Sequence, residues 1–327
     1  MSVQITIIGL GQIGTSIGLS LSKYPDRFKR IGYDKALEIQ NKAKGMGAFD
    51  AVKFNLSAAI ENADLVLVCI PLDQVESTFE SISPLLKDNA VVIDFSPVKS
   101  TAYTWFKKYS APGKYFIGLV SSINAAYLDQ PGSGIDAASE FLFEKTTIGV
   151  TVPSGTPTQV IKLAVDLIEM IGAQAIFLDM QEADGMEMTA HIIPQVISAA
   201  LLNATVGLPG WTETRRFAGR TFFQTTAALG SDTIRAIQTA LLNNPVSAVN
   251  ALNNMIGALT HIRNAIDTKN DADLQKRLEL AFSDRETWLN ERYKAKWNDF
   301  LPKQDAPKSG EMLKHILLGG FKKEKKK

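Results

Sequence analysis

Three glycines near the N-terminus have the spacing of a phosphate-binding turn. The motif Gly9-x-Gly11-x-x-Gly14 directly follows the apolar run 5–8 and opens a segment with helical periodicity. In such a turn the first glycine makes the bend, the second lets the backbone approach a pyrophosphate, and the third lets the helix pack closely on the strand. The helix N-terminus adds free N–H groups and a partial positive charge. The motif therefore predicts a dinucleotide site, and the alternative is a packing turn that binds no ligand.

Asp34 ends the second predicted strand and lies 20 residues after Gly14. That is about the spacing at which a carboxylate binds the ribose 2′-OH of a dinucleotide. A carboxylate there would repel a 2′-phosphate, which favours NAD as the cofactor. The ammonium of the neighbouring Lys35 could serve a 2′-phosphate, so NADP stays open as an alternative.

Two further predicted strand ends, Ile70-Pro71 and the turn that contains Ser96, lie at the same edge of the sheet. Ligands of open α/β sheets bind outside the carboxyl ends of the strands. Ordinary turn chemistry is the alternative at both places. The predicted cofactor-binding residues are Gly9, Leu10, Gly11, Gln12, Ile13, Gly14, Asp34, Lys35, Ile70, Pro71 and Ser96.

The elements that must position these residues alternate along the first half of the chain. Short apolar runs at 4–8, 30–33, 65–70, 90–94, 115–119, 147–152 and 175–178 are separated by helical segments. Runs this short, flanked by helices, are typical of buried parallel strands. The sequence therefore predicts a Rossmann-type α/β fold, with a doubly wound parallel sheet, over residues 1–180.

Beyond residue 180 the pattern becomes helical, with helices predicted at 183–206, 232–242, 246–266 and 272–297. We expect an all-helical substrate and dimerisation domain over residues 181–300 and a linker with a basic tail over 301–327. The helix 183–206 is apolar on more than one face, so it must be buried. A unit of about 120 residues usually needs a partner to bury such a helix. The sequence thus predicts a homodimer, and the alternative is burial of this helix inside one subunit.

The composition excludes some classes of function. The chain has 327 residues, 45% of them hydrophobic, and a formal net charge of +1, so no nucleic-acid surface is expected. The sequence contains no uninterrupted run of about 18 apolar residues, so no membrane span is expected. The one cysteine, Cys69, sits in an apolar run and is expected in the core, which fits a reducing cytoplasm. Neither a Cys/His metal spacing nor a Gly-x-Ser-x-Gly elbow is present, so no metal is expected.

Over roughly residues 3–290 the chain resembles the prephenate/arogenate dehydrogenases. The motifs that carry this resemblance are the segment 8–16 around the glycine turn, Gly32-Tyr33-Asp34, the segment 63–71, Val92-Ile93-Asp94 with Val98-Lys99, the segments 133–138 and 142–144, and His191-Ile192-Ile193-Pro194. The resemblance implies a Rossmann domain with a helical dimerisation domain. It also implies oxidation of a ring hydroxyl by hydride transfer to a nicotinamide, coupled to loss of a carboxylate. Such chemistry needs a base or acceptor on the hydroxyl, usually a histidine, and a cation for the carboxylate, usually an arginine.

The chain departs from the family where the substrate is expected. The family's Gly-x-His-Pro motif falls on residues 118–124, which contain no histidine, and its serine before Val-Lys falls on Pro97. Its Ser-His-Leu-Pro-His segment falls on residues 190–195, which lack the serine and the second histidine. Its Phe-Arg-Asp-Thr-Thr-Arg segment falls on residues 222–227, which contain no arginine. The segments expected to bind the cofactor keep the motifs of the family, whereas the segments expected to bind the substrate differ from its motifs.

Replacement groups are present in the substrate half. His191 could act as the acid or base, or lie at the edge of the core. Ser122 and Asn124, together with Ser121, could hydrogen-bond a substrate oxygen or simply turn the loop. The predicted catalytic residues are His191, Asn124 and Ser122, and the candidate anion-binding cations are Arg215, Arg216 and Arg220.

These features predict an NAD(P)-dependent oxidoreductase that acts on a small acidic substrate. The alternatives are a dinucleotide-binding dimer without catalysis and a reductase of a different substrate.

Overall fold

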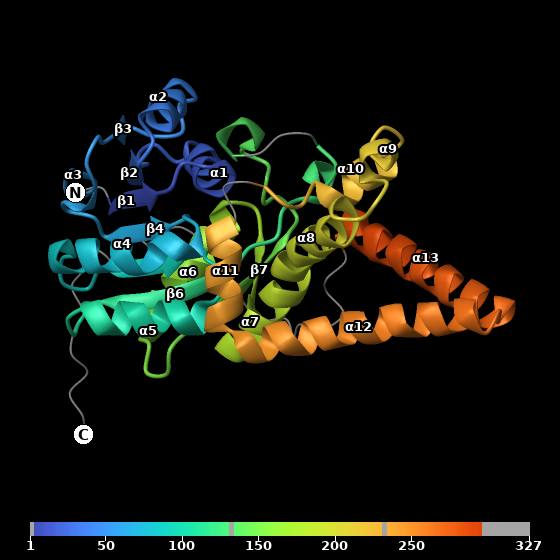
Figure 1. Cartoon of the computed structure of the whole chain (residues 1–327). Coiled ribbons are helices and arrows are strands. Elements are labelled where there is room, and N and C mark those ends of the chain that lie inside the picture. The colour runs from blue at the N-terminus through green and yellow to red at the C-terminus, as the bar shows by residue number, and fades with distance from the viewer. Residues whose placement is uncertain (1–2, 131–133, 231–233, 296–327) are drawn as a thin grey trace.

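The computed structural model describes residues 3–130, 134–230 and 234–295. The predicted linker and basic tail at 301–327, and His315 within it, lie outside these residues. Two units of structure follow one another along the chain (Figure 1). The last strand ends at Phe177, and helices follow from Met180 onward. The division into domains at residues 180 and 300 stays a prediction.

The first unit is built on an eight-stranded sheet with the strand order β3-β2-β1-β4-β5-β6-β7-β8. The strands are β1 Val3–Ile8, β2 Phe28–Tyr33, β3 Ala51–Val52, β4 Leu65–Val68, β5 Val91–Asp94, β6 Tyr115–Val120, β7 Thr147–Thr151 and β8 Gln174–Phe177. Each of the seven predicted runs forms a strand within two residues of its expected bounds. The two-residue strand β3 was not predicted, because so short a segment carries no alternation of apolar and polar residues.

Two strands run against the predicted direction. β7 pairs antiparallel with β6, with Leu119 opposite Val150, and β8 pairs parallel with β7, so both run opposite to the strands before them. In the described part of the connection from β6 to β7, residues 121–130 and 134–146, the helices are the short 3-10 helices η3 (Ala125–Tyr127) and η4 (Gly134–Ala137). A parallel pairing needs a crossover that returns the chain to the opposite edge of the sheet. Here the chain re-enters the sheet from the edge it left, so the prediction of a parallel sheet was wrong at β7 and β8.

Helices cover both faces of the sheet (Figure 1). On one face lie α1 (Gln12–Leu21), α2 (Leu37–Gly45) and α6 (Thr158–Met170). On the other lie α3 (Leu56–Ile60), α4 (Val75–Ile82) and α5 (Lys99–Tyr109), joined by parts of the helical half. The carboxyl ends of the parallel strands meet at one edge between these layers.

The helical half begins with α7 (Met180–Glu187), a π-helical turn η5 (Met188–Ile192) and α8 (Ile193–Val206). Short helices α9 (Trp211–Thr214) and α10 (Arg220–Thr226) and the longer α11 (Ile234–Asn243) follow. The long helices α12 (Pro245–Asp267) and α13 (Asp271–Lys294) form a hairpin whose far end extends away from the sheet (Figure 1). Within the chain α12 buries only Ala248 and Ala265, and α13 buries no residue.

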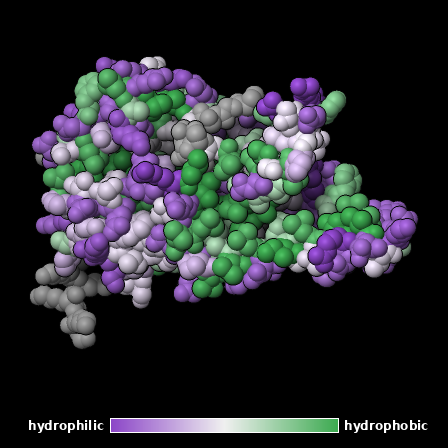
Figure 2. All heavy atoms as spheres, in the orientation of Figure 1, coloured by the Kyte–Doolittle hydropathy of each residue, from purple (hydrophilic) through white to green (hydrophobic). Residues whose placement is uncertain are grey.

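The helical half exposes a large apolar surface. In Figure 2 hydrophobic residues gather over the region of α8, α11 and α12. The continuous helix Met180–Val206 is long and apolar enough to span a membrane by length and composition, and 17% of its most apolar window is buried. The single chain therefore leaves most of this helix uncovered. Met188, Ile192 and Ile193 pack in the core on one face of the sheet, so burial within one subunit accounts for one side of this helix and leaves the rest uncovered.

Candidate functional site

The glycine turn at the end of β1 is tightly packed at Gly9 and Gly14 and open at Gly11. A Cβ at Gly9, where φ is +90°, would lie 2.3 Å from the carbonyl oxygen of Cys69. A Cβ at Gly14 would lie 2.0 Å from the carbonyl oxygen of Gly9. A Cβ at Gly11 would meet nothing within 4 Å. Packing thus requires glycine at the outer two positions, and the open space at Gly11 is where a pyrophosphate could approach the backbone.

The start of α1 suits an anion. Gly11 is the N-cap residue and provides no side-chain cap, so no capping side chain occupies the first N–H groups of the helix. Leu10 is fully buried and anchors the turn in the core. Gln12 donates from Nε2 to the carbonyl of Ala137 at 3.1 Å, and Ile13 packs against the core. These contacts hold the turn in place without filling the space beside Gly11.

Asp34 lies against the glycine turn at the end of β2. Its Oδ2 accepts a hydrogen bond from the backbone N–H of Leu10 at 2.8 Å, and its Oδ1 accepts one from Ala36 at 2.9 Å. Each carboxylate oxygen can accept a further hydrogen bond, so the ribose hydroxyls of a dinucleotide could bind here. The adjacent Lys35 is exposed. The structure thus brings the predicted glycine turn and the predicted ribose-binding carboxylate together.

The other predicted cofactor residues lie at the ends of β4 and β5. Ile70 borders the turn, because a Cβ at Gly9 would lie 2.7 Å from its Cγ2, and Pro71 is exposed beside it. Cys69 packs against the core, as expected, and burial raises the pKa of its thiol. Ser96 is buried and donates from Oγ to Oδ2 of Asp94 at 2.7 Å. Its hydroxyl therefore points inward, to the carboxylate, in this structure.

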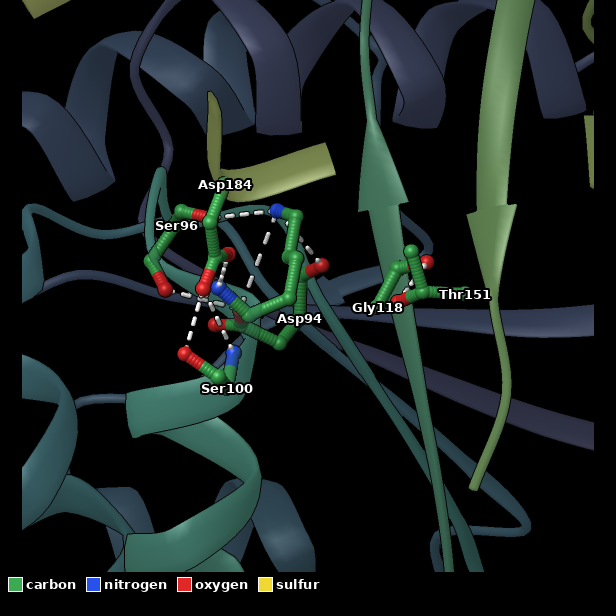
Figure 3. A network of polar contacts seen from close by, with 7 residues as sticks. Asp94, Ser96, Ser100, Gly118, Thr151 and Asp184 are labelled. Atoms are coloured by element: carbon green, nitrogen blue, oxygen red, sulfur yellow. Dashed lines mark hydrogen bonds and ion pairs between the residues drawn. The ribbon is translucent and has the colours of Figure 1, made fainter. Parts of the chain in front are cut away.

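Behind this edge lies a buried group of charged residues that we call the edge cluster: Asp94, Lys99, Asp184 and Glu187. Nζ of Lys99 donates to the carbonyl of Ser96 and lies 3.9 Å from Oδ2 of Asp94 (Figure 3). Oδ1 of Asp184 accepts from the backbone N–H of Lys99 at 2.5 Å, and its Oδ2 accepts from the hydroxyl of Ser100. These bonds dock α7 onto the turn between β5 and α5.

The edge cluster holds three carboxyl groups and one ammonium group. Burial raises the pKa of Asp94, Asp184 and Glu187, while the charge of Lys99 acts in the opposite direction on each. The sequence placed Asp94 at a strand end on the carboxyl edge, indicated Lys99 only through the resemblance, and did not indicate Asp184 or Glu187. The signal available in the sequence was a pair of acidic residues, three positions apart, at the start of a helix that becomes apolar soon afterwards.

His191 follows the edge cluster on the same helix. It lies in the π-helical turn η5, a feature often found at functional sites. Its Nε2 is 3.8 Å from Oε2 of Glu187, and 54% of its side chain is exposed, against 8% for Glu187. The imidazole is therefore open to a ligand on one side and faces a buried carboxyl group on the other. This arrangement allows proton exchange with a substrate hydroxyl.

Ser122 and Asn124 lie in the loop that leaves β6. Ser122 donates from Oγ to the carbonyl of Thr147 at 2.9 Å. Oδ1 of Asn124 accepts from the N–H of Ala126 at 3.1 Å and caps η3. Both side chains bond to backbone groups nearby, which favours their role in shaping the loop over direct contact with a substrate.

The arginines divide into two groups. The three predicted anion-binding residues, Arg215, Arg216 and Arg220, are exposed around α9 and α10. The sequence reasoning missed Arg292 on α13, which is half-buried and donates from Nη2 to the carbonyl of Ile123, in the loop that leaves β6. No motif distinguishes Arg292 in the sequence, since only the folding-back of α13 brings it to the sheet.

Comparison with known proteins agrees with this geometry. Residues 17–177 match the family described as prephenate dehydrogenase, nucleotide-binding domain. The chain is 27% identical over 266 residues to the cyclohexadienyl dehydrogenase of Zymomonas mobilis, covering 80% of this chain and 88% of that protein. The nucleotide-binding half of the chain thus matches the prephenate dehydrogenase family, and the relative from Zymomonas mobilis extends the similarity over most of the chain. This confirms the resemblance that the motifs predicted.

Further prephenate dehydrogenases match over a shorter part of the chain or at lower identity. The prephenate dehydrogenase of Lactococcus lactis is 27% identical over 201 residues, which span 53% of its length. The crystal structure of the Aquifex aeolicus prephenate dehydrogenase, in complex with hydroxyphenyl propionate and NAD+, superposes with a TM-score of 0.74 at 19% identity. It covers 88% of this chain and 98% of its own, and confirms the Rossmann-type fold with a helical second half. The family match begins at Ile17, so the function of the glycine turn rests on its own geometry.

Proposed function

We propose that this protein is an NAD(P)-dependent dehydrogenase, with NAD preferred, that oxidises a small acidic substrate of the prephenate or arogenate class. The observation that carries the proposal is the open glycine turn with the carboxylate of Asp34 hydrogen-bonded against it. The family match and the names of the relatives support the choice of reaction.

The residues present fit a dinucleotide. The N-terminus of α1 and the backbone at Gly11 would hold the pyrophosphate, and Asp34 would accept from the adenosine ribose. Ile70 and Pro71 would line the path toward the ends of β4 and β5. A bound nicotinamide dinucleotide supplies the hydride acceptor for oxidation of an alcohol.

His191 would take the proton from the substrate hydroxyl as its carbon is oxidised. Its exposed face is open to the substrate, and its other face lies near Glu187. When Glu187 is ionised, its charge stabilises the imidazolium that this proton transfer creates. The edge cluster holds Glu187 in place because Asp184, one turn earlier on the helix, is bonded to the start of α5. Glu187 is thus a positioning residue, and His191 is the proton acceptor.

Reduction of NAD by the purified protein tests this proposal. With prephenate or arogenate as substrate we expect a rise in absorbance at 340 nm, and His191→Ala should lower kcat/KM by at least ~100-fold. His261→Ala, on the exposed surface of α12, is the matched control and should keep full activity. NAD binding without turnover of either substrate would favour the alternative of a dinucleotide-binding protein without catalysis.

We further propose that the protein is a homodimer formed through the helical half. The uncovered helix Met180–Val206 and the exposed apolar residues of α12, which include Val246, Ile256 and Leu259 at 72%, 59% and 57% exposure, support this. Apolar surface of this extent is typical of a subunit interface. A second copy offers the same surface, so the two can cover each other around a two-fold axis.

A further inference from the structure

A cavity of about 280 Å³ lies at the end of the sheet opposite the glycine turn. The last two turns of α5, the start of β6 and the turn that follows β7 form its walls. β6 begins at Tyr115 beside this cavity, whereas its carboxyl end adjoins that of β5. The cavity is therefore separated from the carboxyl edge by the length of the sheet, and it shares no residue with the proposed cofactor and substrate sites.

Aromatic rings form one wall of the cavity. The ring centroids of Tyr103 and Phe106 each lie 5.5 Å from that of Phe116, with the planes tilted by 39° and 42°. Phe106 and Phe116 are buried in the core, and Tyr103 is half-buried. Rings held in this way can pack against a further aromatic ring in an offset or edge-to-face arrangement. The volume is sufficient for one ring with a small substituent, since about 150 Å³ is enough for benzene.

Two lysines make the cavity electropositive. Nζ of Lys114 lies 2.6 Å from Oδ1 of Asp88, which is exposed, so this charge is already paired. Lys107 forms no ion pair with the described residues, and its Nζ lies 5.7 Å from the centre of the Tyr103 ring. The described residues that line the cavity include no aspartate or glutamate. The charge of Lys107 is therefore available to an anion that enters beside the aromatic wall.

The opposite wall is a tight turn after β7. The backbone N–H of Thr156 donates to the carbonyl of Pro153 at 3.2 Å, and Gly155 between them has a φ of +82°. Such a turn is closed by its own hydrogen bond. Ser154 is exposed in this turn, and its hydroxyl forms no hydrogen bond with the described residues. The turn thus adds a hydroxyl donor for an anionic group to the cavity.

We propose that this cavity binds a one-ring aromatic carboxylate, with the ring against Tyr103 and the carboxylate beside Lys107. An aromatic amino acid fits less well, because its ammonium group is repelled by Lys107 and meets no acidic side chain in the described lining. The inference goes beyond the proposed function and does not depend on it. The competing explanation is a surface hollow that holds only water.

Titration of 4-fluorobenzoate into the full-length protein, followed by fluorine NMR, measures this binding. Lys107→Gln removes the charge at an exposed position, and Ala111→Phe adds a ring at an exposed position of the lining. Lys108→Gln is the matched control, since Lys108 is the next residue on α5, is exposed and pairs with Glu76 outside the lining. His191→Ala reports on binding at the carboxyl edge, and 4-fluorophenylalanine is the second probe.

We expect the wild type, Lys108→Gln and His191→Ala to bind 4-fluorobenzoate with the same Kd. Lys107→Gln should raise this Kd at least about threefold, the effect of a partly exposed ion pair. Ala111→Phe should raise it about tenfold, because its ring competes for the space. The wild type should bind 4-fluorophenylalanine at least about threefold more weakly than 4-fluorobenzoate.

Three results would overturn the inference. The first is the absence of saturable 4-fluorobenzoate binding by the wild type, and the second is an unchanged Kd in Lys107→Gln. The third is loss of binding in His191→Ala, which would place the probe at the carboxyl edge. Equal affinity for 4-fluorophenylalanine would overturn the assigned class of ligand. If Ala111→Phe does not fold, Lys107→Gln decides alone, since its side chain is exposed and its loss leaves the core intact.

Discussion

The carboxylate of Asp34 accepts a hydrogen bond from the backbone N–H of Leu10, across 24 residues of sequence, at 2.8 Å. This bond joins the end of β2 to the glycine turn after β1. It fixes a negative charge beside the open space at Gly11 before any cofactor binds. In the proposed function, the selectivity between NAD and NADP would therefore depend on a side chain that also supports the turn.

Asp34→Asn should weaken this selectivity. The amide keeps one acceptor and removes the charge that repels a 2′-phosphate, and the exposed Lys35 then favours that phosphate. We expect the ratio of kcat/KM for NAD over NADP to fall by about tenfold, the effect of ~1.4 kcal/mol. Asp26→Asn, an exposed aspartate in the turn before β2, is the control. An unchanged ratio would show that Asp34 does not contact the ribose.

The edge cluster should make stability depend on pH. Burial raises the pKa of Glu187 in the folded protein, so the folded state favours its neutral form. This contribution is fully present below the ordinary pKa of a glutamate and is lost as pH rises through the raised pKa of the folded state. We therefore expect Glu187→Gln to gain stability relative to the wild type as pH increases from 4 to 8.

Urea unfolding at several pH values measures this difference. Glu38→Gln, at an exposed position on α2, serves as the control and should follow the wild type. A Glu187→Gln curve parallel to the wild type across the whole range would contradict the buried, proton-retaining state of Glu187.

Much of the cofactor half was predictable from sequence because its signals are local. The apolar runs and the glycine spacing identify strands and a turn without knowledge of the rest of the chain. The direction of β7 and β8 was not predictable, since it depends on the side from which the chain re-enters the sheet after β6. The same holds for Asp184 and Arg292, whose partners Lys99 and Ile123 lie 85 and 169 residues away in the sequence.

The proposed homodimer predicts that a charge introduced on the exposed apolar surface of α12 disrupts the dimer. Ile256→Asp places a carboxylate in the exposed apolar surface, which a partner would cover. Burying an unpaired charge costs several kcal/mol, so we expect the variant to be a monomer by size-exclusion chromatography with light scattering. Asn254→Asp, exposed and on the far side of α12 from Ile256, should stay dimeric. If the wild type is a monomer and binds phosphatidylcholine vesicles, this would instead indicate that a membrane, and not a second subunit, covers the exposed apolar surface.

A comparison of two glycines separates ligand binding from folding. A Cβ at Gly14 would lie 2.0 Å from the carbonyl oxygen of Gly9, so Gly14→Ala should destabilise the fold by several kcal/mol and lower the melting temperature. A Cβ at Gly11 meets no protein atom within 4 Å, and its backbone, at φ −73° and ψ −160°, is open to alanine. Gly11→Ala should therefore melt within a few degrees of the wild type.

Calorimetric titration of NAD into the wild type and into Gly11→Ala tests the central claim most directly. The added methyl group occupies the open space that the pyrophosphate needs, in a protein whose fold is unchanged. We predict that the wild type binds NAD and that Gly11→Ala binds it at least about tenfold more weakly. Equal affinity in the two proteins, or no binding to the wild type, would contradict the assignment of the glycine turn as the dinucleotide site.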